Sequence, residues 1–407
     1  MKSQTDKPIT GLVLPGGGAR GAFQVGVLRA IADMMPHGSV NPFAVLSGTS
    51  AGAVNSVVLA SRARRFRVAV AELHRVWGHF RSGQVFRADG WTMFKSSAHW
   101  LSAIVLGGNL VGAPRSLLDN APLRTLLSRN VRFPRIQDSI DRGYLKAVAV
   151  TAAGYSSARS TTFFQASPGE REWSRTRRVG VRRSLNLDHL MASIAVPLIF
   201  PPVRIEGEFF GDGAMRQATP LSSAIHLGAD RILVIGVRNE TGDPVGDPNQ
   251  PQPLPSFAQI AGYMLDTLFM DGMYSDLERM TRLNQVIDSV PEDRRTGALR
   301  RIRPIDTMIV VPSRDLRDIA EEHRNEMPLP VRALLRGVSG RSRESASRLL
   351  SFLLFEQGYT QALIDLGYKD AMAVMDQLLA FVTGRDVPRL FAPDWVRKDL
   401  SLPADEP

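Results

Sequence analysis

The stretch from Gly48 to Gly52 reads GTSAG and follows the apolar run Phe43 to Leu46, so it places one serine between two glycines at the expected end of a strand. A serine at the tip of a tight strand-to-helix turn, the nucleophile elbow, has a strained backbone. It needs small neighbours because strand and helix approach each other closely there. Ala51 to Ser61 is rich in alanine and valine and predicts a helix whose N-terminus points at Ser50.

A second glycine-rich stretch, Gly16-Gly17-Gly18-Ala19-Arg20-Gly21, follows the strand-like run Ile9 to Leu14 and opens an apolar helix pattern. Consecutive glycines can turn their N–H groups toward one point, so we expect this loop to bind a phosphate or a tetrahedral oxyanion. The letters also satisfy the dinucleotide fingerprint GxGxxG, but the next strand runs into Ser47 to Ser50 without the acidic residue that holds a ribose. A Walker loop is excluded because no Lys-Ser or Lys-Thr pair closes the glycine run.

Asp212 ends an expected hairpin whose turn is Glu206-Gly207 and is followed by Gly213 and Ala214. A carboxylate at a strand end is a candidate general base, although an Asp-Gly pair is also ordinary turn chemistry. Burial beside the neighbouring Phe209 and Phe210 would raise the pKa of this carboxyl and make it a stronger base toward Ser50.

Taken in order, GGGARG, GTSAG, the stretch Ala192 to Pro202 (ASIAVPLIFPP) and Asp212-Gly213-Ala214 resemble the motifs of the patatin-like phospholipase family, from Thr10 to Val237. The resemblance implies a three-layer α/β fold with a central, mostly parallel sheet, and a phospholipase A or lysophospholipase activity that uses neither metal nor cofactor. It further implies that Ser50 is the nucleophile and Asp212 the base of a Ser-Asp dyad. The N–H groups of Gly16, Gly17 and Gly18 would hold the oxyanion, and Arg20 would support the loop.

Three alternatives remain open at this point. A Ser-His-Asp α/β-hydrolase would need a histidine after the acid, and His226 has the right chain order, but it lies within an expected helix. A non-enzymatic lipid-binding or regulatory protein would leave the three motifs without a purpose. A dinucleotide-binding protein is disfavoured by the missing acidic residue.

Composition limits the class of protein and its surroundings. With 407 residues and 44% hydrophobic content, the chain can bury a large core. It contains no cysteine, which excludes disulfides, thiol nucleophiles and cysteine-based metal sites. Met1 to Thr10 is polar and Trp100 to Ala113 is too short to span a bilayer, so we expect a cytoplasmic protein.

Arginine accounts for most of the net charge of +10 and is most concentrated between Arg171 and Arg183. Such runs are usually solvated loops. This one lies before the Asp212 motif, so it could instead bind an anionic membrane surface. No nucleic-acid motif accompanies the charge. The arginines concerned are Arg171, Arg175, Arg177, Arg178, Arg182 and Arg183.

We expect a catalytic domain over residues 9–237, with residues 81–115 as a lid, and a Pro/Gly-rich linker over 239–256. Residues 257–383 predict a mostly helical region, with a strand at Thr307 to Val311 and helices across Ser342 to Val382, before a tail at 384–407. These helices would pack on the sheet or mediate self-association; the sequence does not specify an oligomeric state.

Overall fold

The computed structural model describes residues 8–87, 116–217, 219–238, 272–297, 302–333, 343–385 and 387–393, with isolated positions at 260, 262–264, 267 and 299. In these ranges one mixed sheet has the strand order β11-β10-β9-β1-β2-β3-β4-β6-β5, while β8 pairs with β3 and β7 with β8. The strands are β1 (Thr10–Leu14), β2 (Val45–Thr49), β3 (Ala147–Gly154), β4 (Ser160–Ala166), β5 (Trp173–Arg175), β6 (Arg178–Arg182), β7 (Val203–Ile205), β8 (Glu208–Asp212), β9 (Arg231–Ile235), β10 (Asp306–Val310) and β11 (Leu390–Phe391).

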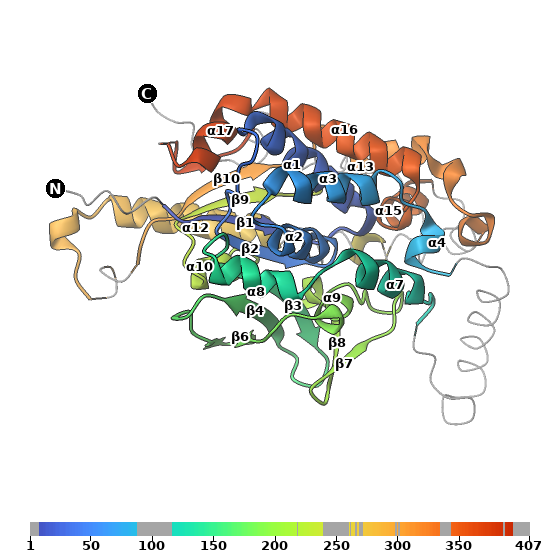
Figure 1. Ribbon diagram of the computed structural model, residues 1–407, viewed down its shortest axis with the longest axis horizontal. Coiled ribbons are helices and arrows are strands. Elements are labelled where there is room, and N and C mark those ends of the chain that lie inside the picture. Colours follow the sequence, from blue (N-terminus) through green and yellow to red (C-terminus); the bar gives the residue numbers. More distant parts are fainter. Residues whose placement is uncertain are drawn as a thin grey trace, which may run out of the picture.

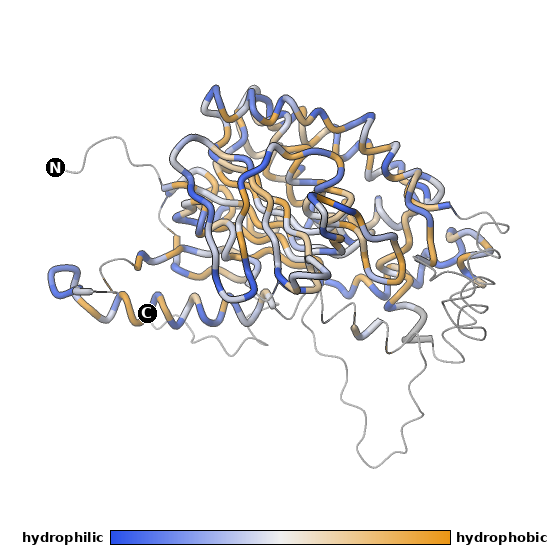
Figure 2. The backbone as a smooth tube through the Cα atoms, turned by 90° about the horizontal axis from the view of Figure 1, so that it is seen from below, coloured by the Kyte–Doolittle hydropathy of each residue, from blue (hydrophilic) through white to orange (hydrophobic). Residues whose placement is uncertain are grey.

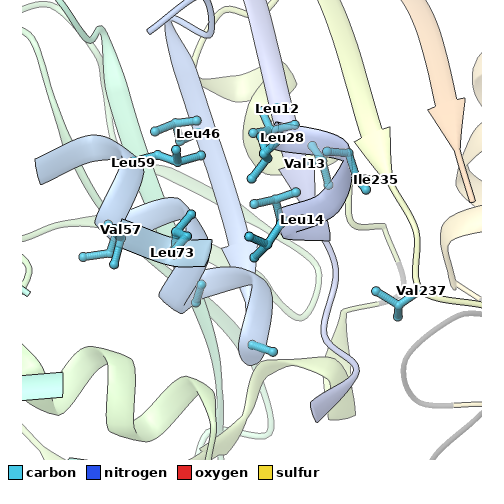
Figure 3. Close-up of a cluster of buried hydrophobic side chains, with 14 of the residues drawn as sticks. Leu12, Val13, Leu14, Leu28, Leu46, Val57, Leu59, Leu73, Ile235 and Val237 are labelled. Atoms are coloured by element: carbon cyan, nitrogen blue, oxygen red, sulfur yellow. The ribbon is translucent and has the colours of Figure 1, made fainter. Parts of the chain in front are cut away.

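Neighbouring strands from β11 to β3 run parallel, and β4 and β8 pair antiparallel with β3. Every residue of β1, β2 and β9 is buried, as expected for parallel strands that helices cover on both faces. Figure 3 shows Leu12 and Leu14 of β1 among apolar side chains of the neighbouring helices and strands. Each fully buried leucine or valine of this kind contributes about 1.5–3 kcal/mol.

Helices cover both faces of the sheet, and the hydrophilic residues gather on their outer sides (Figures 1 and 2). β2 and β3 extend the sheet on one side of β1, and β9 and β10 extend it on the other side. Right-handed crossovers therefore place the helical connection between β9 and β10 on the opposite face of the sheet from α1 and α2. The α-helices are α1 (Ala22–Met34), α2 (Ala51–Ser61), α3 (Phe66–Trp77), α4 (Ser82–Val85), α7 (Ala121–Asn130), α8 (Pro134–Asp141), α9 (Leu187–Ser193), α10 (Ser222–His226), α12 (Gly272–Asp288), α13 (Leu316–Glu322), α15 (Arg343–Leu353), α16 (Gln357–Ala373) and α17 (Met375–Thr383).

The C-terminal region joins the same sheet and the same core. β10 pairs with β9, and α16 lies along α1 (Figure 1). Glycines allow this close crossing: a Cβ on Gly26 would lie 2.1 Å from the carbonyl oxygen of Ile364, and one on Gly367 would lie 2.2 Å from that of Phe23. The C-terminal helices therefore press directly on the helix that follows the glycine loop.

The three-layer fold and the helical C-terminal region are confirmed. The arginine-rich run is not a loop: it forms the edge hairpin β5–β6, in which Arg175 pairs with Arg178. Alternating side chains of a strand point to opposite faces, so the arginines of this run do not form one surface. The expected linker lies outside the described residues, and so do residues 88–115 of the expected lid.

Candidate active site

Ser50 lies between the end of β2 and the start of α2 with φ 54° and ψ −126°, a left-handed conformation that is unfavourable for a residue with a side chain. The flanking glycines are required by space. A Cβ on Gly52 would lie 2.0 Å from the carbonyl oxygen of Leu14, and one on Gly48 would lie 2.4 Å from that of Gly52. The turn therefore holds the Ser50 hydroxyl in a fixed, strained position beside the end of β1.

Strand pairing brings Asp212 to Ser50. Thr49 pairs with Thr151 of β3, and Asp212 pairs with Ala152, the next residue along β3. β2 and β8 therefore lie end to end against one strand, and Ser50 and Asp212 lie close together where the two strands end. Gly213 permits the turn that follows, because a Cβ there would lie 2.2 Å from the carbonyl oxygen of Thr151.

Asp212 is 1% exposed, and burial raises the pKa of its carboxyl to about 7, against the opposing effects of hydrogen bonds from the Ser50 hydroxyl and the Ala214 N–H. The Ala214 N–H donates to Oδ1 at 2.9 Å. Oδ2 is buried without a well-aligned partner, so the contact with Ser50 is looser than an ordinary hydrogen bond, as is common in catalytic sites without substrate. The expectation that Phe209 helps to bury Asp212 is wrong: Phe209 is 49% exposed on the outer side of the hairpin, while Phe210 is buried.

The glycine loop becomes the short 3₁₀ helix η1 (Gly18–Gly21) directly before α1. Within the described residues, no group accepts a hydrogen bond from the N–H of Gly16, Gly17 or Gly18, and Gly18 lines the apolar pocket that also reaches Ser50. Gly21 allows the loop to touch the elbow helix, because a Cβ there would lie 2.9 Å from Cβ of Ala51. Ala19 is completely buried beneath the loop.

Arg20 does not face solvent. It is 2% exposed and donates from Nε and Nη2 to Oγ of Ser351, at 3.1 and 2.7 Å. Its guanidinium also lies 3.9 Å from the centre of the Phe352 ring. In addition, the Phe352 carbonyl oxygen packs against Gly18 so closely that a Cβ on Gly18 would lie only 2.3 Å from it. Ser351 and Phe352, near the end of α15, thus fix the position of the glycine loop.

Two buried polar side chains that belong to none of the recognised motifs stabilise the elbow. Ser193 accepts a hydrogen bond from the Ser50 N–H at 2.9 Å and donates to the Thr151 carbonyl at 2.6 Å, so it links Ser50 to β3. Asn55 of α2 bonds to Gly21, to Gln24 and to the indole N–H of Trp77. The signal available for Ser193 was its position as a polar residue within the apolar ASIAV stretch.

An apolar pocket reaches Ser50 and Gly18 and encloses about 90 Å³, well below the roughly 300 Å³ at the lower end of small-molecule sites. An acyl chain must therefore widen it. Apart from Ser50, its polar side chains among the described residues are Glu72 and Asn130. The apolar lining comes from α2, from residues 73–85 in and between α3 and α4, from α7 and the residue after it, from residues 194–200 and from residues 352–355 at the end of α15: Ala51, Val54, Val58, Leu73, Val76, Trp77, Phe80, Val85, Leu123, Leu126, Leu127, Val131, Ile194, Val196, Ile199, Phe200, Phe352, Leu353 and Phe355.

The candidate histidines lie elsewhere. His226 stacks on Trp173 and bonds through Nδ1 to the Ser222 carbonyl, and His323 bonds to Glu326. Nδ1 of His189 accepts from the Asn186 N–H. Among the described residues no histidine contributes to the pKa of Asp212. The Ser-His-Asp arrangement with His226 therefore has no support in this geometry.

A strained serine at a strand-to-helix turn, a buried carboxyl facing it and a loop of N–H groups without acceptors are together typical of a serine esterase built on an α/β sheet. The chain matches the family model for patatin-like phospholipase over residues 12–225, which is more than half of its length. It belongs to the patatin-like phospholipase family and is an esterase of the phospholipase type.

Solved structures resemble it only distantly. VipD from Legionella pneumophila is 12% identical with a TM-score of 0.32, covering 97% of this chain and 73% of that chain. The heterodimeric complex ExoU-SpcU from the type III secretion system of Pseudomonas aeruginosa is 15% identical with a TM-score of 0.24, covering 85% of this chain and 74% of that chain. None of the curated proteins matches the chain.

Replacing Gly18 by alanine is expected to lower kcat by about a hundredfold with little change in KM, because an oxyanion donor acts mainly in the transition state. Gly18 has φ +55°, and the new methyl group would push the loop away from Phe352. Gly38→Ala is the matched control: Gly38 has φ +84° with nothing within 4 Å of its Cβ position, so it introduces similar backbone strain outside the site. Equal kcat and KM values in the two variants would show that the glycine loop does not stabilise the transition state.

Proposed function

We propose that the protein is a phospholipase A or lysophospholipase that cleaves lipid acyl esters through a Ser50–Asp212 dyad. The observation that carries this proposal is the meeting of strained Ser50 with buried Asp212 at one end of an apolar pocket. A base works best when its pKa lies near the working pH, and the value of about 7 for Asp212 meets that condition.

In the first half of the reaction, Ser50 Oγ attacks the ester carbonyl while its proton passes to Asp212, and the carbonyl oxygen becomes an oxyanion. The N–H groups of Gly16, Gly17 and Gly18 donate to that oxygen. The C–O bond to glycerol then breaks, and Asp212 returns the proton to the leaving alcohol. In the second half, Asp212 takes a proton from water, which attacks the acyl-enzyme carbonyl. The bond from that carbon to Ser50 Oγ then breaks, Asp212 returns the proton to Ser50 Oγ, and the fatty acid is released.

The experiment that tests this function is release of fatty acid from phosphatidylcholine and lysophosphatidylcholine vesicles as a function of pH. Because Asp212 must be unprotonated to act, kcat/KM should rise with pH and level off above the Asp212 pKa of about 7. At pH 5 it should be about a hundredfold below the plateau, whereas an unperturbed aspartate would still be fully active there. A flat profile from pH 5 to 8 would contradict Asp212 as the base.

We also propose that substrate is reached from an anionic membrane surface, through exposed residues at the carboxyl ends of the strands. Phe209 and Tyr155 are 49% and 46% exposed and adjacent, since the Tyr155 N–H donates to the Phe209 carbonyl. Arg204 pairs across the hairpin with Phe209, and Arg159 and Arg177 flank Ser160. We call this set the aromatic–arginine rim: Tyr155, Arg159, Arg175, Arg177, Arg204 and Phe209.

The rim differs from the set of arginines that the sequence suggested. Arg178 donates to Thr219, Arg182 donates to the Ala166 and Ser167 carbonyls, and Arg183 pairs with Glu206. These three stabilise the fold. The rim also lies close to Asp212: burial, and after it the charge of Asp212, raises the pKa of Tyr155. Aromatic and arginine side chains together suit the interface between lipid and water.

Changing Arg159 and Arg177 to glutamine should weaken binding to vesicles that contain anionic lipid by about 1 kcal/mol for each arginine, and less at high salt. Sedimentation with phosphatidylserine vesicles measures this. Arg282→Gln with Arg294→Gln, both exposed on other elements, controls for net charge. Equal weakening in the control would mean that binding follows total charge rather than the rim.

A further inference from the structure

A second cleft, of about 430 Å³, lies at the opposite end of α2 from Ser50. Its volume falls within the roughly 300–1,000 Å³ range of ligand sites. Its lining includes five arginines: Arg62, Arg64, Arg65, Arg135 and Arg142. The first three follow the last residue of α2, and the other two belong to the segment formed by α8 and the residue after it.

Four of these arginines carry uncompensated charge. Within the described ranges, the side chains of Arg64, Arg65, Arg135 and Arg142 form no hydrogen bond or ion pair with the protein. Asp138 is the one acidic residue in the lining. Guanidinium groups that share a concave surface repel one another, and an anion between them would turn that repulsion into paired, charge-assisted hydrogen bonds.

Helix electrostatics accounts for only part of the cluster. Cations after the last turn of α2 interact favourably with the negative end of its dipole, which would explain Arg64 and Arg65. Arg135 and Arg142 are seven residues apart, on one side of α8 with Ser139 between them, and they gain nothing from α2. Their convergence on the same cleft indicates a ligand.

We propose that the cleft binds a soluble ligand that carries two or more phosphate groups. Guanidinium groups bind phosphate in a bidentate manner, and several around one cavity match a polyphosphate better than a single anion. The Asn41 N–H donates to the Ala63 carbonyl, and the Lys146 N–H donates to the Ala44 carbonyl just before β2, so the cleft lies at the amino ends of β2 and β3. The aromatic–arginine rim lies at the carboxyl ends, so a molecule resting on a membrane by the rim turns the cleft toward water.

One ion pair joins the cleft to the apolar pocket. Arg62, which lines the cleft, pairs with Glu72, which lines the pocket that reaches Ser50. Both side chains are largely buried, at 20% and 15% exposure. A polyphosphate competes with Glu72 for Arg62, so binding in the cleft alters the far end of the pocket. This coupling rests on the proposed function, whereas binding itself does not.

Calorimetric titration with tripolyphosphate tests the site without any catalytic readout. We expect saturable 1:1 binding that Arg64→Gln with Arg135→Gln weakens about tenfold or more, while Arg282→Gln with Arg294→Gln, outside the cleft, changes it less than about twofold. Absence of binding, or equal loss in both double variants, would overturn the site. Binding only to vesicles with phosphatidylinositol bisphosphate, and not to tripolyphosphate, would overturn the soluble ligand.

The coupling predicts a gain of affinity. Glu72→Gln removes the carboxylate that competes for Arg62, so the affinity for tripolyphosphate should rise about three- to tenfold. Unchanged or weaker tripolyphosphate binding in a folded Glu72→Gln protein would show that Glu72 and the ligand do not compete for Arg62. If tripolyphosphate binds as expected but changes neither kcat nor KM on long-chain esters, the site stands and its link to the pocket is refuted.

Discussion

Ser50→Ala should abolish ester hydrolysis, with a loss on the order of 10⁴-fold or more, while the fold is retained. The substitution removes a single oxygen, and the buried hydrogen bond from the residue 50 N–H to Ser193 remains. Hydrolysis of a soluble short-chain ester measures the loss, and circular dichroism checks the fold.

Ser50→Gly is the matched variant. Glycine tolerates the φ of +54° that strains serine, so this variant should be as inactive as Ser50→Ala yet more stable, by about 1 kcal/mol. Near-normal turnover in either variant would remove Ser50 from the mechanism. A lower melting temperature for Ser50→Gly would show that the elbow stores no strain.

Asp212→Asn should remove activity as completely as Ser50→Ala, about 10⁴-fold. Asparagine can still accept the Ala214 N–H bond that Oδ1 receives, so the turn is retained, but it cannot take the Ser50 proton. Steady-state kinetics on the same ester, at pH 8 where Asp212 is unprotonated in the parent enzyme, measures the effect.

Histidine variants are the control for this prediction. His189→Gln, His226→Gln and His323→Gln should each retain most activity and leave the acid limb of kcat/KM in place. Their ring nitrogens serve helix caps and local contacts instead. If any one of them in a folded protein were as damaging as Ser50→Ala, a histidine-based triad would replace the dyad.

The sequence predicted the elements that carry local patterns. The elbow, the glycine loop and the hairpin to Asp212 each have glycines where the backbone must turn or approach another segment, and these appear at the expected positions. The expected helix Ala51 to Ser61 and the expected strand Thr307 to Val311 likewise appear, as α2 and β10, to within one residue.

Features that depend on distant pairing could not be predicted. The Arg20–Ser351 contact joins residues 331 positions apart, and the Ser50–Ser193 contact joins residues 143 apart. Neither contact produces a periodic pattern in the sequence. The C-terminal helices were expected to pack on the sheet or to mediate self-association, yet Phe352, Leu353 and Phe355, at and just after the end of α15, line the pocket. The arginine-rich run showed its charge but not its strand register, which decides which guanidinium groups face outward.

Intact mass after reaction with a fluorophosphonate probe tests the central claim most directly, because only an activated serine forms the phosphonyl adduct. The dyad predicts one adduct on the parent protein, located at Ser50 by peptide mapping. It predicts none on Ser50→Ala and a strongly slowed reaction on Asp212→Asn. An unmodified parent protein, or an adduct of equal yield on Ser50→Ala, would contradict the assignment of Ser50 as the nucleophile.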